Sequence, residues 1–389
     1  MIQINPTHEG PVHPALPIFV SIGIMARNEA DSIHHTIASL FAQSVFREMA
    51  AHGSCLEITC VVNGSTDGTA EVVKNLFAEA SQNHPQRNHF KARVHTVQES
   101  GKPNACNQFI HACSGKEARY LVLMDADIIF VHQTAIWKLL EGLEDNKYAM
   151  VTVGTPLKSL DPDKSLTLRE KLSLATSRMT QSAPGQLTGQ LYCIRTGTAR
   201  HIHFPRALPS CDDGYVKSLV CTNFGQTQLQ NNRIRTVPHA AHKFDPYLPF
   251  SHILMNQKRQ MMGQTFLHVL LDQFIPGLQP AERADLGRVI RHLEENQPSW
   301  LAGLMSQHLL ATRYFWRLFP GFLTFRFQRL KAFPLRQRIQ FLPATLAGFL
   351  VTLIAGWLAA RSLRQGNSHY WPELRRPKNC PDHQTTPSP

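Results

Sequence analysis

The sequence predicts an α/β protein with a mostly parallel, Rossmann-like sheet and helices on both faces, followed by a helical, membrane-associated C-terminal region. Short apolar strands alternate with amphipathic helices over the first half, which is typical of parallel sheets. Polar loop residues follow each of these strands. Near the other end, residues 339–360 contain no charged side chain, which indicates contact with a membrane.

The first strand is predicted from the apolar run at 18–24, and the first helix, over 32–42, from Ile33, Ile37 and Leu40 at helical spacing. A second apolar run at 56–62 predicts the next strand. It is followed by a helix over about 69–80, whose apolar residues lie on one side.

A weaker third strand is predicted at 93–97. Pro103 suits a first helical turn and opens a helix that ends near Cys113. The short apolar run at 120–124 predicts the fourth strand. This alternation brings four strands into one sheet, covered by helices on both faces.

Polar and small residues follow each predicted strand, where parallel sheets bind ligands, beyond the carboxyl ends of the strands. Considered singly, each loop also fits a turn or a helix N-cap. Four such loops on one edge favour a ligand site. The candidate donor-binding residues are Ala26, Arg27, Asn28, Glu29, Asn63, Ser65, Asp67, Gly101, Lys102, Asn104 and Asp125.

Asp125 and Asp127 end the fourth strand, where two carboxylates are costly unless a cation neutralises them. Two acids spaced by one residue can present hard oxygen ligands to Mg²⁺ or Mn²⁺, which in turn holds nucleotide phosphates. A turn or helix-cap role is the alternative.

Four segments resemble successive nucleotide-sugar signatures of glycosyltransferase family 2: 21–29, 62–69, 101–107 and 125–127. The resemblance extends over about residues 17–250. It implies a GT-A fold, a nucleoside-diphosphate sugar donor and a divalent metal. The family often has a base-contacting acid at the position of Asn63, so the identity of the nucleotide base stays open, although an amide can also pair with a base edge.

The resemblance continues in two segments of the second half of this domain. Residues 185–195 resemble the acceptor-side segment, which implies acceptor binding by Gly189 and Gln190; a strand with a glycine bulge is the alternative. Residues 210–216 resemble the paired-acid motif, which implies catalytic roles for Asp212 and Asp213, with Asp213 as the general base. The two acids could also cap a helix that begins at Gly214.

A third metal ligand is implied at His242, because some related transferases complete the metal site with a histidine in this stretch. The chain has 20 histidines, so a surface or core role is the alternative. In the implied reaction a carboxylate takes the proton of the acceptor hydroxyl. The metal neutralises the leaving diphosphate, and the resemblance implies inversion at the anomeric carbon.

The chain has 389 residues and a formal net charge of +12, and its length allows a large catalytic domain with an appendage. Residues 301–372 contain no Asp or Glu, so the C-terminal region carries the positive excess. The predicted parts are an N-terminal extension (1–16), the catalytic domain (17–250), a helical basic and interfacial region (251–338), an apolar helix (339–360) and a disordered tail (361–389).

The apolar segment 339–360 is long enough to cross a bilayer, but a re-entrant or interfacial helix fits it too. Arginines at both ends give no orientation. The stretch 300–327, rich in aromatic residues and arginines, is typical of a helix on an anionic lipid surface; a buried amphipathic helix is the alternative. A nucleic-acid partner is disfavoured, because the apolar span has no use there.

Residues 1–16 lack the apolar core of an export signal, and eight cysteines without metal-type spacing favour reduced thiols. We therefore expect an enzyme at the cell membrane with a cytoplasmic catalytic domain. It would be a metal-dependent inverting transferase acting on a lipid-linked, glycan or polysaccharide acceptor, and a role in cell-envelope polysaccharide synthesis fits. The alternative is a catalytically silent family member that serves as a membrane-bound scaffold or sugar-binding partner.

Overall fold

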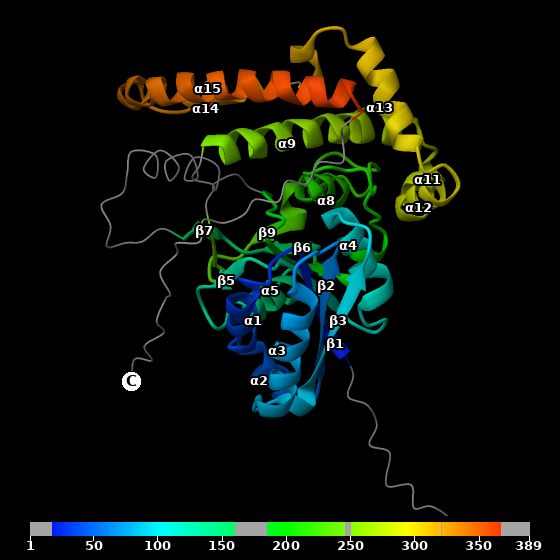
Figure 1. Cartoon of the computed structure of the whole chain (residues 1–389), viewed down its shortest axis with the longest axis vertical. Helices are drawn as coiled ribbons and strands as arrows, with labels where there is room; N and C mark the ends of the chain where they lie inside the picture. The colour runs from blue at the N-terminus through cyan, green and yellow to red at the C-terminus, as the bar shows by residue number, and fades with distance from the viewer. Residues whose placement is uncertain (1–17, 160–184, 246–249, 320, 367–389) are drawn as a thin grey trace, which may run out of the picture.

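The computed structural model describes residues 18–159, 185–245, 250–319 and 321–366. Figure 1 shows an α/β part built from residues 18–159 and 185–245 and a group of helices from residue 250 onward that lies along one side of it. The predicted extension 1–16 lies outside the described residues.

The α/β part is built on a seven-stranded sheet with the order β3-β2-β1-β4-β8-β6-β9. The four predicted strands are its neighbouring members β3, β2, β1 and β4, and they pair in parallel. β8 is antiparallel to β4 and β6, so the sheet is mostly parallel, as predicted. The strands are β1 (Ile18–Ala26), β2 (Cys55–Asn63), β3 (Phe90–Val97), β4 (Tyr120–Asp125), β6 (Val151–Val153), β8 (Leu191–Arg195) and β9 (Ile234–Thr236).

Helices cover both faces of this sheet, because alternate side chains of each strand enter different cores. On β1, Val20, Ile22 and Ile24 belong to one buried cluster and Met25 to the other. One face packs against α1 (Ile33–Phe41), α2 (Val45–Ala51), α3 (Thr69–Asn83) and α5 (Ala135–Glu144). The other packs against α4 (Lys102–Gln108), η2 (Phe109–Cys113), α7 (Thr196–Arg200) and α8 (Asp212–Cys221). The short 3₁₀ helices η1 (Arg87–His89) and η3 (Asn231–Arg233) precede β3 and β9.

Gly23 allows the aromatic ring of Phe109 to lie directly on β1. A Cβ atom at this position would be 2.5 Å from Cγ of that fully buried ring. The close approach brings η2, and α4 before it, down onto the sheet. It therefore helps to fix the start of α4, which carries Lys102.

A second, three-stranded sheet has the order β5-β10-β7 and lies beyond the end of β4. Its strands are β5 (Ile128–Phe130), β7 (Pro156–Lys158) and β10 (His242–Phe244). β10 pairs antiparallel with β5 and parallel with β7. This sheet places His242, the first residue of β10, opposite Phe130, three residues after Asp127, while Asp125 is the last residue of β4.

From residue 250 onward the described part of the chain is helical. The helices are α9 (Phe250–His268), η4 (Val269–Phe274), α10 (Ile275–Gly277), α11 (Pro280–Ala284), α12 (Leu286–Asn296), α13 (Trp300–Ala311), η5 (Phe315–Leu318), α14 (Phe325–Lys331) and α15 (Leu335–Arg364). The stretch 300–327 is not one helix, because the helical structure is interrupted between α13 and η5 and again between η5 and α14. The apolar segment 339–360 lies inside α15, which extends four residues beyond each of its ends.

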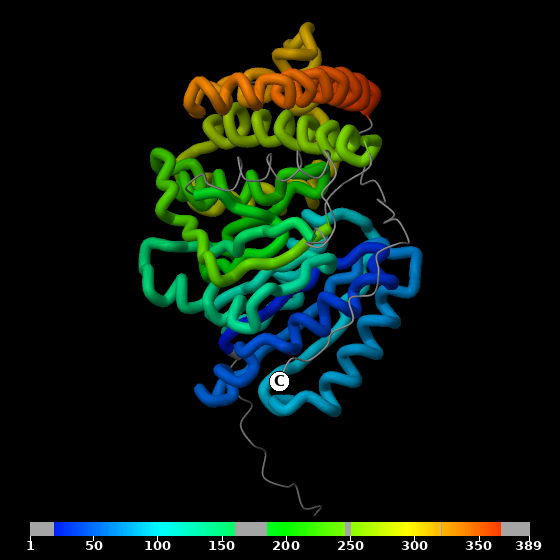
Figure 2. Tube along the Cα trace, turned by 90° about the vertical axis from the view of Figure 1, so that its left-hand side faces the viewer, coloured from blue at the N-terminus to red at the C-terminus, as the bar shows by residue number. Residues whose placement is uncertain are grey.

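The first residues of the predicted tail, up to Arg364, are therefore helical, and residues 367–389 lie outside the described part of the chain. In both views α15 runs alongside α9 on the outside of the molecule (Figures 1 and 2). Nε2 of Gln257 on α9 donates a 2.6 Å hydrogen bond to Oγ1 of Thr352, and Gly356 lies against Met261. α15 is thus held along its inner face.

Candidate active site

The first two loops at the carboxyl ends of the strands are joined by hydrogen bonds. Asn28 has a left-handed backbone (φ 53°), its N–H donates to Oγ of Ser65, and its Oδ1 accepts from the N–H of Thr66. Asp67 accepts from the N–H of Ala30. Burial acts to raise the pKa of Asp67, but hydrogen bonds from the hydroxyl of Thr69, the N–H of Ala30 and the N–H of Thr69 lower it. The predicted donor residues of these loops are brought together, and several also hold the loops in place.

Asn63, at the end of β2, is buried and joins three loops. Its Nδ2 donates to the carbonyl of Ala26 at 3.0 Å, and its Oδ1 accepts from the N–H of Gly101 at 2.9 Å. This side chain has an architectural role at the sheet edge, whatever part it takes in contacting a nucleotide base. Asn104 similarly fixes the third loop, because its Nδ2 donates to the carbonyl of Glu99.

Lys102 is the centre of the site. Its Nζ lies 2.6 Å from Oδ1 of Asp125 and 3.4 Å from Oδ2 of Asp212, and it donates to the carbonyl of Gly189 at 2.9 Å. Burial alone would lower the pKa of this ammonium group, but the two carboxylates reverse the effect and raise it. Lys102 is therefore charged, and it connects the predicted donor side, Asp125, with the predicted catalytic pair.

Gly189 lies against this cluster. A Cβ atom there would be 2.9 Å from Oδ2 of Asp212 and 3.3 Å from Nζ of Lys102. The absence of a side chain allows the backbone to approach both groups. The predicted acceptor residue Gln190 follows it, and its carbonyl accepts from the N–H of Asp125. The acceptor-side segment and the donor-side aspartate are thus directly joined.

Asp212 and Asp213 begin α8, two residues before the helix start expected at Gly214, so both lie in its first turn. Oδ1 of Asp213 accepts from the N–H of Gly214 at 2.7 Å. Burial, reinforced by the neighbouring charge of Asp212, raises the pKa of Asp213 to about 6. A carboxylate with such a pKa is ionised at neutral pH and is a stronger base than an ordinary aspartate.

Burial likewise raises the pKa of Asp125 to about 6, although Lys102 acts to lower it and Asp127 to raise it further. Such a pair of acids fits a hard divalent cation, which would relieve their repulsion. Among the described residues, no three His, Cys, Asp or Glu side chains are grouped as a metal-binding set. The structure thus brings the two aspartates together without assembling the predicted trio.

His242 is fully buried, and burial lowers its pKa to about 4, so the imidazole is neutral, the form that binds metals. Its Nε2 lies 3.3 Å from Oε1 of Gln190, and its Nδ1 has no hydrogen-bond partner within the described part of the chain. Gln190 thus contacts His242 through its side chain and Asp125 through its carbonyl. Its predicted role as a ligand stays a prediction.

Two residues close to the cluster were not predicted from the sequence. Cys106 and Tyr192 are buried near the charged groups, and burial first, then the neighbouring negative charges, raise the pKa of both. Cys106 follows Lys102 by four residues on α4, and Tyr192, on β8, follows by two residues Gln190, which immediately precedes that strand. Helical and strand periodicity place these pairs on common faces, and this signal could have found them.

The sheet is mixed and mostly parallel, and Lys102, Asp125 and Asp212 meet at the carboxyl end of β4, where α/β sheets bind ligands. Residues 21–203 match the family model Glycosyl transferase family 2, and this part of the chain is a domain of that family. The resemblance is confirmed over these residues, and the paired-acid segment 210–216 lies beyond them. The search of curated proteins found no match.

Solved structures similar to this chain include two of glucosyl-3-phosphoglycerate synthase from Mycobacterium tuberculosis. One is in complex with Mn²⁺, UDP-glucose and phosphoglyceric acid. It is 17% identical to this chain, the match covers 64% of this chain and 79% of the synthase chain, and the TM-score is 0.42. The other, with Mg²⁺ and UDP, is 18% identical, covers 66% and 80%, and has a TM-score of 0.43.

Proposed function

We propose that this protein is an inverting glycosyltransferase that moves a sugar from a nucleoside-diphosphate sugar to the hydroxyl group of a lipid-linked, glycan or polysaccharide acceptor. The observation that carries the proposal is the cluster around Lys102, which joins Asp125 of the donor side to the paired acids on α8. Lys102, Asp125 and Gly189 lie within the stretch that matches family 2, and Asp212 and Asp213 follow it in the sequence.

In the proposed reaction Asp213 takes the proton of the acceptor hydroxyl as its oxygen attacks the anomeric carbon. The raised pKa supports this role, because the group becomes a better proton acceptor while it remains ionised at neutral pH. Gly189 allows the backbone of the proposed acceptor-side segment to lie directly against Asp212 and Lys102. Lys102 counters negative charge between the base and the leaving diphosphate.

Asp125 and Asp127 would hold Mg²⁺ or Mn²⁺, and His242 is the proposed third ligand. When bound, such a cation supplies Lewis-acid neutralisation of the leaving diphosphate. Independently of the cation, the chain's own residues fix the loops that surround the donor, through the hydrogen bonds of Asn28, Asn63 and their partners.

We further propose that one sugar is added in each reaction. Processive relatives usually carry a Gln-x-x-Arg-Trp element, and the nearest segment here, Gln257 to Met261, lacks its arginine and tryptophan at the required positions. This segment lies within α9, where Gln257 donates to Thr352 of α15. Its glutamine therefore contributes to helix packing.

The test of the proposed function is to offer the purified protein a panel of nucleotide sugars with a membrane lipid extract and Mn²⁺, and to detect products by mass spectrometry. A new glycosylated species that depends on one donor supports the proposal. If neither transfer nor donor hydrolysis occurs with any donor, the alternative of a silent scaffold replaces it. Omission of Mn²⁺ tests the metal in the same experiment.

We also propose that the protein lies on the cytosolic face of the cell membrane, with α15 in the plane of the interface rather than across the bilayer. Among the described residues, α15 is the one helix with the length and composition of a span. Its 30 residues, about 45 Å long, present one exposed apolar stripe along the outer side. The stripe consists of Leu335, Ile339, Leu342, Leu346, Leu350, Ile354 and Trp357.

The inner side of α15 supports this in-plane arrangement. Lys258 and Arg259 are on α9, which runs alongside, and Arg326 of α14 donates to Thr352 at 3.3 Å. To cross the bilayer, α15 would either leave these partners or take the charged helices with it, at a cost of about 2.5–3.5 kcal/mol for each charge at the bilayer centre. Lying in the interface avoids both costs.

We expect both ends of α15 to be accessible from the same side of the membrane. Arg336→Cys and Gln365→Cys, made separately with Cys380→Ser, would be treated with a membrane-impermeant maleimide in sealed vesicles from producing cells. The seven cysteines in the described residues are buried and provide a low background. If α15 lies in the plane of the interface, both variants should react in vesicles of one orientation and neither should react in vesicles of the opposite orientation. Reaction at only one end, with both reacting in detergent, would show that α15 spans the bilayer.

A further inference from the structure

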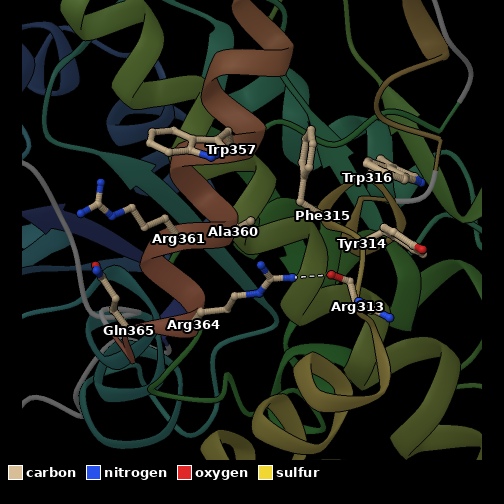
Figure 3. A pocket seen from close by; sticks show the side chains of 9 residues that line it. All are labelled: Arg313, Tyr314, Phe315, Trp316, Trp357, Ala360, Arg361, Arg364 and Gln365. Atoms are coloured by element: carbon tan, nitrogen blue, oxygen red, sulfur yellow. Dashed lines mark hydrogen bonds between the residues drawn. The ribbon is translucent and has the colours of Figure 1, made fainter.

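A pocket lies where the last turns of α15 meet the segment between α13 and η5, outside the candidate active site. Its volume is about 530 Å³, within the usual range for small-molecule sites. Figure 3 shows the side chains of α15 on one side and those of residues 313–316 on the other. The lining residues are Arg313, Tyr314, Phe315, Trp316, Trp357, Ala360, Arg361, Arg364 and Gln365.

The pocket is rich in cations that no acid neutralises. Three of its residues are arginines, and the sequence has no Asp or Glu between 301 and 372. Within the described residues these three arginines form no ion pair. Arg364 reaches across to donate one hydrogen bond to the carbonyl of Arg313 at 2.9 Å, and Arg361 lies 5.8 Å from the ring centre of Trp357. A guanidinium has five N–H donors, so most remain available for an anion.

Aromatic rings at the pocket have the exposure typical of a membrane interface. Tyr314 and Trp316 are stacked with ring centres 4.8 Å apart, and their exposed fractions are 44% and 49%. Trp357 is 53% exposed and is the last member of the apolar stripe on α15. Tyrosine and tryptophan favour the level of lipid headgroups, where one part of the ring is wet and the other apolar.

We propose that this pocket binds the phosphate of an anionic phospholipid headgroup, with Arg361 and Arg364 as its main ligands and Arg313 as a third cation. Arginine forks match phosphate oxygens in a bidentate manner. The adjoining stripe of α15 gives the acyl chains of the same lipid an apolar surface. The site thus orients the protein on the bilayer, and it depends on the membrane placement of α15 but not on sugar transfer.

The test is flotation of the full-length protein with vesicles of phosphatidylcholine alone and with added phosphatidylglycerol. We compare Arg361→Gln/Arg364→Gln with a matched control, Lys331→Gln/Arg336→Gln, which removes the same charge from exposed residues near the other end of α15. The pocket variant should lose about ten-fold more affinity for the anionic vesicles than the control. Equal losses would mean diffuse attraction and overturn the proposal.

Three further arms make the outcome specific. Arg361→Lys/Arg364→Lys keeps the charge and loses the fork, so its binding should fall well below that of the unchanged protein; full retention would overturn a shaped phosphate site. Inorganic phosphate is added as a competitor. If inorganic phosphate binds as strongly as the anionic vesicles and depends on the same arginines, the ligand is free phosphate and the lipid assignment is wrong.

Because Arg364 also donates a hydrogen bond to the backbone, Arg313→Gln serves as a further variant that removes no such bond. It should weaken vesicle binding in the same direction.

Discussion

Asp213→Asn should lower kcat for sugar transfer by about 10² to 10⁴-fold while the affinity for the nucleoside diphosphate stays unchanged. Asparagine keeps an oxygen that can accept the N–H of Gly214, so the first turn of α8 retains its hydrogen bond. It cannot take a proton from the acceptor hydroxyl. The change therefore removes base catalysis and leaves the geometry of the site.

The pH profile provides a second measurement of the same residue. The pKa of Asp213 is raised to about 6, so the carboxylate is ionised above this pH and protonated below it. Transfer by the unchanged protein should therefore fall as the pH drops through about 6. The residual rate of Asp213→Asn should fall less steeply, because Asp125, whose pKa is also raised to about 6, is then the one of the two acids that still titrates in this range. Asp272→Asn, on an exposed carboxylate of η4, is the matched control and should transfer at the normal rate. Normal transfer by Asp213→Asn would place the base elsewhere.

The strands and the polar loops at their ends were predictable because both signals are local. Apolar runs marked β1, β2 and β4, and the motif residues that follow them form the observed site edge. The cluster around Lys102 was predicted in its parts but not in its arrangement. Its contacts with Asp125 and Asp212 join residues far apart in the sequence, and no local pattern encodes such distances.

Two features show why the remainder needed the structure. Asn63 was predicted as a base contact from its place in a motif, but its amide also connects Ala26 with Gly101, a role set by the approach of three loops. The apolar sequence of 339–360 fits a helix that spans a membrane as well as one that lies on it. The packing of α15 on α9, through Gln257 and Thr352, favours the second arrangement.

Lys102→Met should lower the free energy of unfolding by about 3 kcal/mol, measured by urea denaturation in EDTA. Removing one member of a buried ion pair leaves its partners as uncompensated charges, which costs about 3–5 kcal/mol. The lower end applies because the side chains of Lys102, Asp125 and Asp212 keep exposed fractions of 13%, 23% and 15%. Transfer should be lost as well, since the cation between the base and the leaving group is gone.

Lys74→Met is the matched control, because Lys74 is an exposed lysine that pairs with Glu71 at 3.4 Å on α3. It should change the free energy of unfolding by no more than about 0.5 kcal/mol. If the two variants are equally stable, the acids around Lys102 are better solvated than the structure indicates. If Lys102→Met then loses transfer but keeps full stability, Lys102 acts on the bound donor and does not stabilise the fold.

The double variant Lys102→Met/Asp125→Asn should recover about 1–2 kcal/mol of the lost free energy of unfolding, because a neutral amide replaces one unpaired carboxylate. Mn²⁺ separates the roles of this aspartate. If Asp125 is a metal ligand, Mn²⁺ should raise the Tm of Lys102→Met more than that of the double variant, since a divalent cation then offsets the missing lysine only where the carboxylate remains. An equal rise in both would exclude Asp125 as a ligand and leave Lys102 as its cationic partner.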